Sequence, residues 1–239
     1  MKRLARLVLG VLALGLVCGV AVRAEERAKG TADAAATKLL ADARAARAVY
    51  QHFPGFSADI EVNLDGKATH GTVEVSDKGK VALKLDAAAA EKWAKNTLAS
   101  TIAHRLDSGS SSGETPCAFA DEDAHHPLGR AIRVLNDEFH SSYRIRDQQV
   151  IVVNRHMPGS RFTITVMENL RTKEGKFLPA SYVVNTWDAK TDALTSSETH
   201  HDTWQRVGAF DLPHETLVVK ATAGKQEARS LKLSNVRLR

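Results

Sequence analysis

Histidine is the side chain most able to do chemistry in this sequence, which has ten of them. The densest group is His200-His201-Asp202. On a β-strand, His200 and Asp202 point to one face and His201 to the other. Two ligands on one face begin a metal site, but a zinc site needs three or four. No H-E-x-x-H or C-x-x-C spacing accompanies them, so the pattern favours a polar, solvent-facing strand over a metal site.

Other reactive side chains point to structure more than to catalysis. Asp59 and Glu61 alternate on the outward face of a predicted strand and would need a cleft to act as an acid–base pair. The serine-rich stretch 108–112 lacks the strand–turn–helix context of a nucleophile elbow. Cys117 would be left alone once an N-terminal leader is removed, so we expect a buried, apolar cysteine.

Two histidine–arginine pairs and three tryptophans leave two interpretations open. His104-Arg105 and Arg155-His156 are either ligand contacts or parts of a buried hydrogen-bond network, or else they are exposed at the surface or cap an element. The second interpretation is favoured, because His104 and Arg105 fall where a helix end attracts cations. The tryptophans fit a core or a cavity wall better than a stacking platform, and they are Trp93, Trp187 and Trp204.

The elements that position these residues are mainly strands. From Phe56 to Leu64 apolar and polar residues alternate without a break, which predicts a half-buried strand. Pro54-Gly55 ends the preceding element and Asp65-Gly66-Lys67 forms the following turn. Similar short alternations, separated by turn residues, continue to a closing strand over 229–238. This pattern predicts a large antiparallel sheet that must curl.

Two amphipathic helices are predicted to cover that sheet. The first follows Thr31 as N-cap, with one apolar stripe formed by Leu39, Ala43, Ala46, Tyr50 and Phe53. The second follows Asp86 and runs to about Arg105, with buried positions at Ala90, Trp93, Ala94, Leu98 and Ile102. The sequence thus predicts an α+β fold in which a curled antiparallel sheet, a half-barrel, is covered by two helices. We expect the residues from Phe56 to Leu64 to lie beneath the first helix.

The N-terminus has the composition of an export signal. A basic segment precedes an apolar run over 7–22, and Val22-Arg23-Ala24 resembles a signal-peptidase site. We therefore predict a signal peptide over 1–24 and one domain over 25–239, exported to the periplasm or the extracellular space without stable membrane insertion. The leader carries four of the five net positive charges. The remaining chain has no clustered basic stripe, which disfavours nucleic-acid binding.

The sequence also resembles a known family. It is similar to an exported bacterial family, domain of unknown function 3386, in short segments spread over most of the chain: 53–56, 65–66, 71–73, 102–105, 207–208, 212–213 and 231–236. The order of elements is similar to that of periplasmic lipoprotein carriers of the Lol type. The first resemblance implies no established activity and no catalytic residues. The second implies a half-open barrel lidded by helices, with an apolar cavity for acyl chains.

Together these observations favour a non-enzymatic binding protein without a cofactor. It would hold an acyl chain, a lipid or a lipidated protein in a curled-sheet cavity. The predicted cavity wall consists of Phe56, Ile60, Val62, Trp93 and Leu98. The alternatives are a metal-binding or metal-dependent protein using His200, Asp202 and other histidines, and a structural envelope protein that binds a partner.

Overall fold

The computed structural model describes residues 30–107 and 115–239, and its main feature is a single antiparallel sheet. The predicted signal peptide and the serine-rich stretch 108–112 lie outside the described residues. Within these, the sheet has twelve strands. In chain order they are β1 (Phe56–Leu64), β2 (Lys67–Val75), β3 (Val81–Lys84), β4 (Cys117–Phe119), β5 (Arg130–Val134), β6 (Ser142–Arg146), β7 (Gln149–Met157), β8 (Ser160–Arg171), β9 (Phe177–Asp188), β10 (Leu194–Val207), β11 (Phe210–Thr222) and β12 (Lys225–Leu238).

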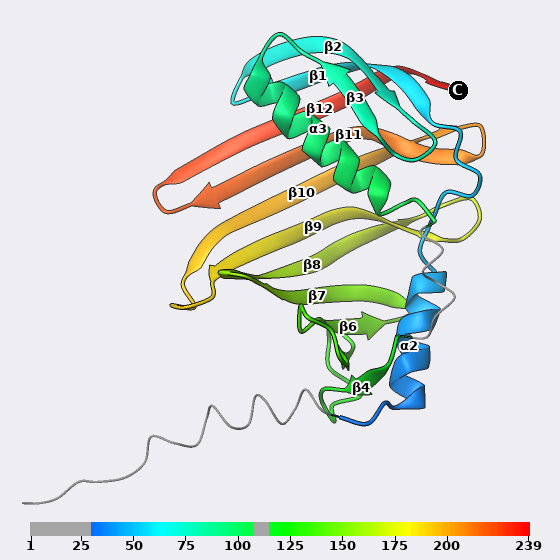
Figure 1. Cartoon of the computed structure of the whole chain (residues 1–239), viewed down its shortest axis with the longest axis vertical. Helices are drawn as coiled ribbons and strands as arrows, with labels where there is room; N and C mark the ends of the chain where they lie inside the picture. The colour runs from blue at the N-terminus through cyan, green and yellow to red at the C-terminus, as the bar shows by residue number, and fades with distance from the viewer. Residues whose placement is uncertain (1–29, 108–114) are drawn as a thin grey trace, which may run out of the picture.

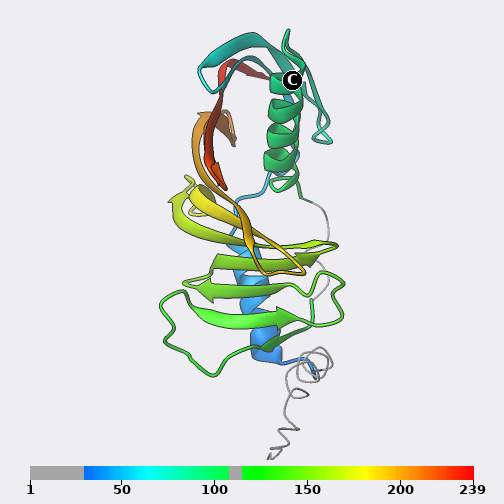
Figure 2. The same cartoon turned by 90° about the vertical axis from the view of Figure 1, so that its left-hand side faces the viewer.

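Most neighbouring strands in the sheet are also consecutive in the chain, and one pair of neighbours is distant in the sequence. The spatial order is β3-β2-β1-β12-β11-β10-β9-β8-β7-β6-β5-β4, so the first strand pairs with the last. β3 and β4 are the two edges, and the sheet curls without closing (Figures 1 and 2). The predicted α+β half-barrel is therefore confirmed.

The first described helix, α2 (Ala34–Ala45), is shorter than predicted. Its N-cap is Asp33, whose carboxylate accepts the backbone N–H groups of Ala35 and Ala36, and not Thr31. Beyond the helix, the Ala48 and Tyr50 N–H groups donate to carbonyls of Phe177 and Arg105. Because these bonds replace helical ones, Tyr50 and Phe53 lie on an extended linker and not on the predicted helical stripe.

The second helix, α3 (Ala88–Ala103), follows the prediction more closely. Its buried residues are Ala90, Ala94, Leu98 and Ile102, while Trp93 is partly buried against the same core. The N-cap is Ala87 and has no side-chain hydrogen bond, so Asp86 does not cap this helix. Instead Glu91 reaches back and accepts the N–H of Leu85 at 3.0 Å. No helix in the described part of the chain is long and apolar enough to cross a membrane.

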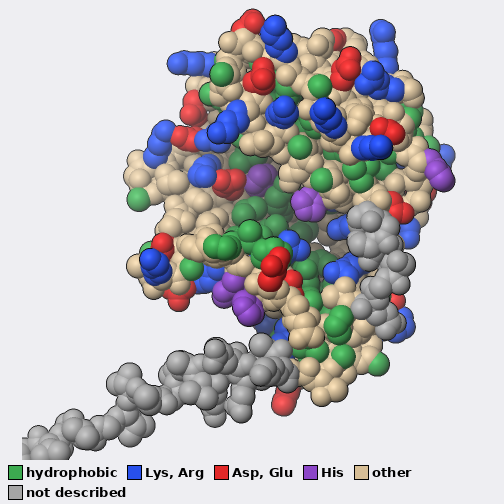
Figure 3. Space-filling model, viewed as in Figure 1, with side chains coloured by type: hydrophobic (Ala, Val, Ile, Leu, Met, Phe, Trp, Pro, Cys, Tyr) green, Lys and Arg blue, Asp and Glu red, His purple; other side chains and the backbone are tan. Residues whose placement is uncertain are grey.

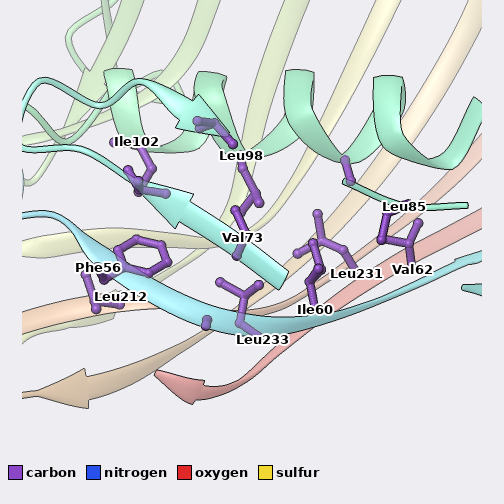
Figure 4. Packing of buried hydrophobic residues seen from close by; sticks show 14 of the residues in the cluster. Phe56, Ile60, Val62, Val73, Leu85, Leu98, Ile102, Leu212, Leu231 and Leu233 are labelled. Atoms are coloured by element: carbon purple, nitrogen blue, oxygen red, sulfur yellow. The ribbon is translucent and has the colours of Figure 1, made fainter. Parts of the chain in front are cut away.

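Each helix covers its own hydrophobic core. The α3 core lies under α3 and is built mainly on β1, β2, β3, β11 and β12 (Figure 4). The α2 core lies under α2 and includes Leu40, Cys117, Ile132 and Tyr143. The expectation that Phe56–Leu64 lie beneath the first helix is wrong, because Phe56, Ile60 and Val62 belong to the α3 core. β1 contacts α3 directly, and α2 packs instead on β4, β6 and β7.

Candidate functional site

One face of the sheet connects the two cores through its central strands. Residues paired directly across antiparallel strands point to the same face. Val62 of the α3 core faces Leu231, which faces Thr216, which faces Asp202. At the far side Ile164 faces Val153, which packs on the α2 core. Both helices therefore lie on one face, and β8, β9 and β10 cross the interval between them.

The middle of this face is apolar and only partly covered. Phe162, Ile164 and Val166 of β8 alternate toward it, and Val184 of β9 lies opposite Ile164. All four side chains are of intermediate exposure, whereas the corresponding positions beneath the helices are buried. Figure 3 shows a hollow on this side of the molecule with hydrophobic side chains in its floor. We call these four residues the apolar strip and the depression above them the central hollow.

A polar cluster adjoins the apolar strip on the side of the α3 core. His200 stacks on Tyr182, with ring centroids 4.5 Å apart. The Thr216 hydroxyl donates to Asp202 Oδ1 at 2.8 Å, and Asp202 is only 6% exposed. These residues share the face of the apolar strip, because Tyr182 pairs with both His200 and Val166. The hollow thus has an apolar part and a polar part on adjacent strands.

The two acidic side chains of the cluster are shifted in opposite directions. Burial raises the pKa of Asp202, although Thr216, His200 and Arg105 partly offset this effect. The adjacent His200 ring, followed by the Lys220 ammonium at 2.7 Å, lowers the pKa of Glu198 to about 2. His200 Nε2 lies 3.5 Å from Glu198 Oε2, but the geometry is too poor for a good hydrogen bond, and neither ring nitrogen has a partner within the described residues.

Arg105 contributes a buried cation beside this cluster. It follows α3 and is 5% exposed, with its guanidinium 5.6 Å from the Trp204 ring centroid. Its Nη1 donates to the Ala48 carbonyl at 3.1 Å, whereas Nε is buried without a partner in the described residues. Burial, followed by repulsion from Arg47, lowers its pKa to about 10, so the group remains charged at neutral pH. The favoured prediction of a surface-exposed His104-Arg105 pair is wrong for Arg105, although His104 is exposed.

The sequence predicted the shared face of His200 and Asp202 but not its direction. Both point toward the hollow, and only His201 is exposed, so the solvent-facing interpretation is wrong for these two residues. Within residues 30–107 and 115–239, no three histidine, cysteine, aspartate or glutamate side chains form a group that could hold a metal ion. His125 and His126 lie beside Arg146 at the β5–β6 end of the sheet, several strands from β10.

The predicted cavity wall lies in the α3 core in this structure. Phe56, Ile60, Val62 and Leu98 are between 0% and 2% exposed and belong to one cluster beneath α3 (Figure 4). Trp93 is partly buried against the same cluster. The apolar strip was visible in the sequence as the alternation of Phe162, Ile164 and Val166. Periodicity identified its face, but it carries no information about which part of that face a helix covers.

The remaining candidate residues lie away from the central hollow. Asp59 and Glu61 are exposed on the outward face of β1, as predicted. Cys117 is a buried free thiol whose Sγ donates to the Thr115 carbonyl at 3.3 Å. Trp187 lies on the outward face under Arg161, whose guanidinium is 4.3 Å from the ring centroid. None of these groups lies in the central hollow.

Comparisons with known proteins give distant structural similarities. The chain is similar to a LolA superfamily protein from Nitrosomonas europaea, with 9% identity, 85% of this chain and 93% of that chain covered, and a TM-score of 0.30. It is also similar to a DUF1329 family protein from Desulfovibrio piger, with 8% identity, 87% and 94% coverage, and a TM-score of 0.30. A structure of MucB in complex with MucA has 12% identity, 86% and 94% coverage, and a TM-score of 0.22.

The sequence comparisons are more decisive about the family. No curated protein matched the chain. The model for the protein family of unknown function DUF3386 matches residues 31–238, which is most of the chain. This match confirms the resemblance seen in the sequence, and the chain belongs to the DUF3386 family.

Proposed function

We propose that this protein binds an apolar chain, such as the acyl chain of a lipid, in the central hollow. The observation that supports it is the partial exposure of Phe162, Ile164, Val166 and Val184 on a face that is buried at both ends. Apolar area left in water is unfavourable by roughly 25 cal/mol per Å². A ligand that covers the strip removes that area without any rearrangement of the two cores.

The surroundings of the strip favour a ligand over a missing internal element. Both helices are already engaged with their own cores. The linker crosses one end of the central strands, where the Ala48 N–H donates to Phe177 of β9 at 2.9 Å. The side chains of the strip are only partly buried, and Figure 3 shows an open hollow on this side of the molecule. A concave, mostly apolar site with a few convergent polar groups is the usual form of a small-molecule pocket.

The proposal differs from the sequence prediction in where the ligand lies. Phe56, Ile60, Val62 and Leu98 would contact a ligand only after α3 moved away from the sheet, because they are packed beneath it. The apolar strip needs no such movement. Export to the periplasm or the extracellular space remains part of the proposal and is supported by the composition of residues 1–24.

Two neighbouring valines on opposite faces of β9 provide a matched test. Val184 points into the hollow, whereas Val183 pairs with Thr165 and Thr199 on the other face. Binding of N-phenyl-1-naphthylamine, a neutral dye that fluoresces in apolar sites, would be titrated for wild type, Val184→Asp and Val183→Asp. A carboxylate in the apolar strip should weaken dye binding at least tenfold, because desolvating it is unfavourable.

The control decides between the hollow and any other apolar surface. Val183→Asp should bind the dye within about twofold of wild type, and both variants should retain the wild-type circular dichroism spectrum. Equal loss in both variants, or no dye binding by the wild type, would contradict a ligand site in the central hollow.

A further inference from the structure

We infer that the ligand is a single-chain carboxylate, a fatty acid, whose head group pairs with Arg105. This inference rests on the proposed function and adds the chemistry of the polar end. Two features support it. Arg105 is a buried cation with N–H groups that have no acceptor among the described residues, and an apolar strip lies on nearby strands. An amphiphile with one apolar tail and one negative charge matches both parts.

Arg105 has a charge that the described residues do not neutralise by direct contact. No carboxylate of a described residue forms an ion pair with its guanidinium within 4 Å. Burial and Arg47 lower its pKa, whereas Tyr50, Asp202 and Tyr182 raise it only through longer-range attraction. A buried charge without a partner is strongly unfavourable. An anion that reaches Arg105 would therefore be held by a charge-assisted interaction.

The free edge of Arg105 has the geometry of a carboxylate receptor. Nη1 donates a hydrogen bond to the Ala48 carbonyl, and Nε has no partner among the described residues. The Nη1 bond is the only side-chain hydrogen bond that Arg105 forms with a described residue, so Nη2 has no described acceptor either. Nε–H and Nη2–H form one side of the planar guanidinium and match the two oxygens of a carboxylate. A single guanidinium edge suits a monoanion better than a doubly charged phosphate.

The Arg105 side chain lies beside the polar cluster that borders the hollow. Trp204, beneath the guanidinium, anchors its indole N–H on the Pro179 carbonyl of β9 at 3.0 Å. Tyr182, on the same strand, lies near enough to affect the pKa of Arg105. Tyr182 also pairs with Val166 of the apolar strip. One ligand can therefore contact Arg105 with its head and the strip with its tail.

The test compares head groups on one tail length, using displacement of N-phenyl-1-naphthylamine by dodecanoate, 1-dodecanol and dodecyl phosphate at pH 7.5. A purely apolar site would prefer the alcohol, since desolvating a carboxylate is unfavourable. We expect wild type to bind dodecanoate at least about tenfold more tightly than dodecanol. This comparison needs no variant, so it stands even if replacement of Arg105 impairs folding.

Variants then assign the preference to one side chain. Arg105→Met should abolish the preference for dodecanoate while dodecanol binding stays within about twofold. Arg161→Met, a matched change on the outward face above Trp187, should behave as wild type. Equal binding of dodecanoate and dodecanol by wild type would overturn the pairing of a carboxylate with Arg105. It would still agree with an apolar ligand site in the central hollow. Preference for dodecyl phosphate would also overturn it, and no displacement by any of the three would overturn both proposals.

Discussion

Tyr182 of β9 and His200 of β10 stack with an interplanar angle of 11° and ring centroids 4.5 Å apart. The pair stands at the border between the polar cluster and the apolar strip, because His200 shares its face with Asp202 and Tyr182 pairs with Val166. One stacked aromatic pair thus separates two chemically different parts of one surface. This division is what the proposed amphiphilic ligand requires.

Replacement of Asp202 by asparagine should stabilise the protein at neutral pH. Burial raises the pKa of Asp202, so the folded state carries an electrostatic penalty above that pKa and none below the unfolded value of about 3.9. Asparagine still accepts the Thr216 hydroxyl but has no charge to desolvate. We expect Asp202→Asn to raise Tm at pH 7 by about 2–4 °C, with the difference shrinking as the pH approaches 4. A Tm of the variant below that of wild type at pH 7, with no difference near pH 4, would show that the carboxylate is needed in its charged form.

Replacement of Glu198 by glutamine should have the opposite pH dependence. The adjacent His200 ring and the ion pair with Lys220 lower the pKa of Glu198 to about 2. The stabilisation is present above the unfolded value of about 4.3 and is lost as the pH falls through about 2. Urea denaturation should show Glu198→Gln less stable by about 1 kcal/mol at pH 7, since the pair is partly solvated. The gap should narrow at pH 3, and a gap that is constant with pH would contradict this origin.

The α3 core should be the main source of stability at its end of the sheet. Leu98 is 1% exposed beneath α3, whereas Leu217 is 40% exposed on the outward face of β11. Leu98→Ala should lower the free energy of unfolding by about 2–5 kcal/mol through lost contacts and a cavity. Leu217→Ala should change it by no more than about 0.5 kcal/mol. Guanidinium unfolding of both variants measures this, and similar effects would mean that α3 is not firmly packed.

Gly55 should be far less replaceable than Gly66, although both have a positive φ. A Cβ at Gly55 would lie 2.3 Å from the Val75 carbonyl oxygen, whereas nothing lies within 4 Å of the same atom at Gly66. Gly66→Ala should cost about 1–2 kcal/mol for the left-handed backbone alone. Gly55→Ala adds the collision with β2 and should unfold at a clearly lower denaturant concentration. Equal midpoints would contradict the close approach of the linker to β2.

Local features of the fold followed from the sequence, because they depend on neighbouring residues. The alternation from Phe56 to Leu64 identified a strand and its buried face, and Pro54-Gly55 correctly preceded it. The identity of the covering helix did not follow, because it depends on contacts distant in the chain. The end of the first helix also depends on distant contacts. The spacing of Tyr50 and Phe53 continues the helical stripe, but α2 ends at Ala45 and tertiary hydrogen bonds hold the residues that follow.

The candidate site was less accessible to prediction than the fold. The shared face of His200 and Asp202 follows from strand geometry, but the direction of that face depends on pairing with Val218 and Thr216. Arg105 resembled an ordinary cation at a helix end, but its guanidinium contacts the Ala48 carbonyl of the linker and lies over the Trp204 ring, and both are distant in the chain. The apolar strip was distinguished from a plain core only by the absence of a helix over the described central strands.

The most direct test of a ligand site in the central hollow is photo-crosslinking with dodecanoic acid that carries a diazirine at the tail end, followed by tryptic peptide mass spectrometry. The apolar strip falls on two clean peptides, 162–171 and 177–190, and the α3-core strand β1 falls on 48–67. We predict labelling of Phe162, Ile164, Val166 or Val184, suppressed by excess unlabelled dodecanoate. Competable labelling confined to 48–67, or labelling of Val183 and Leu217 on the opposite face, would contradict the central hollow as the ligand site.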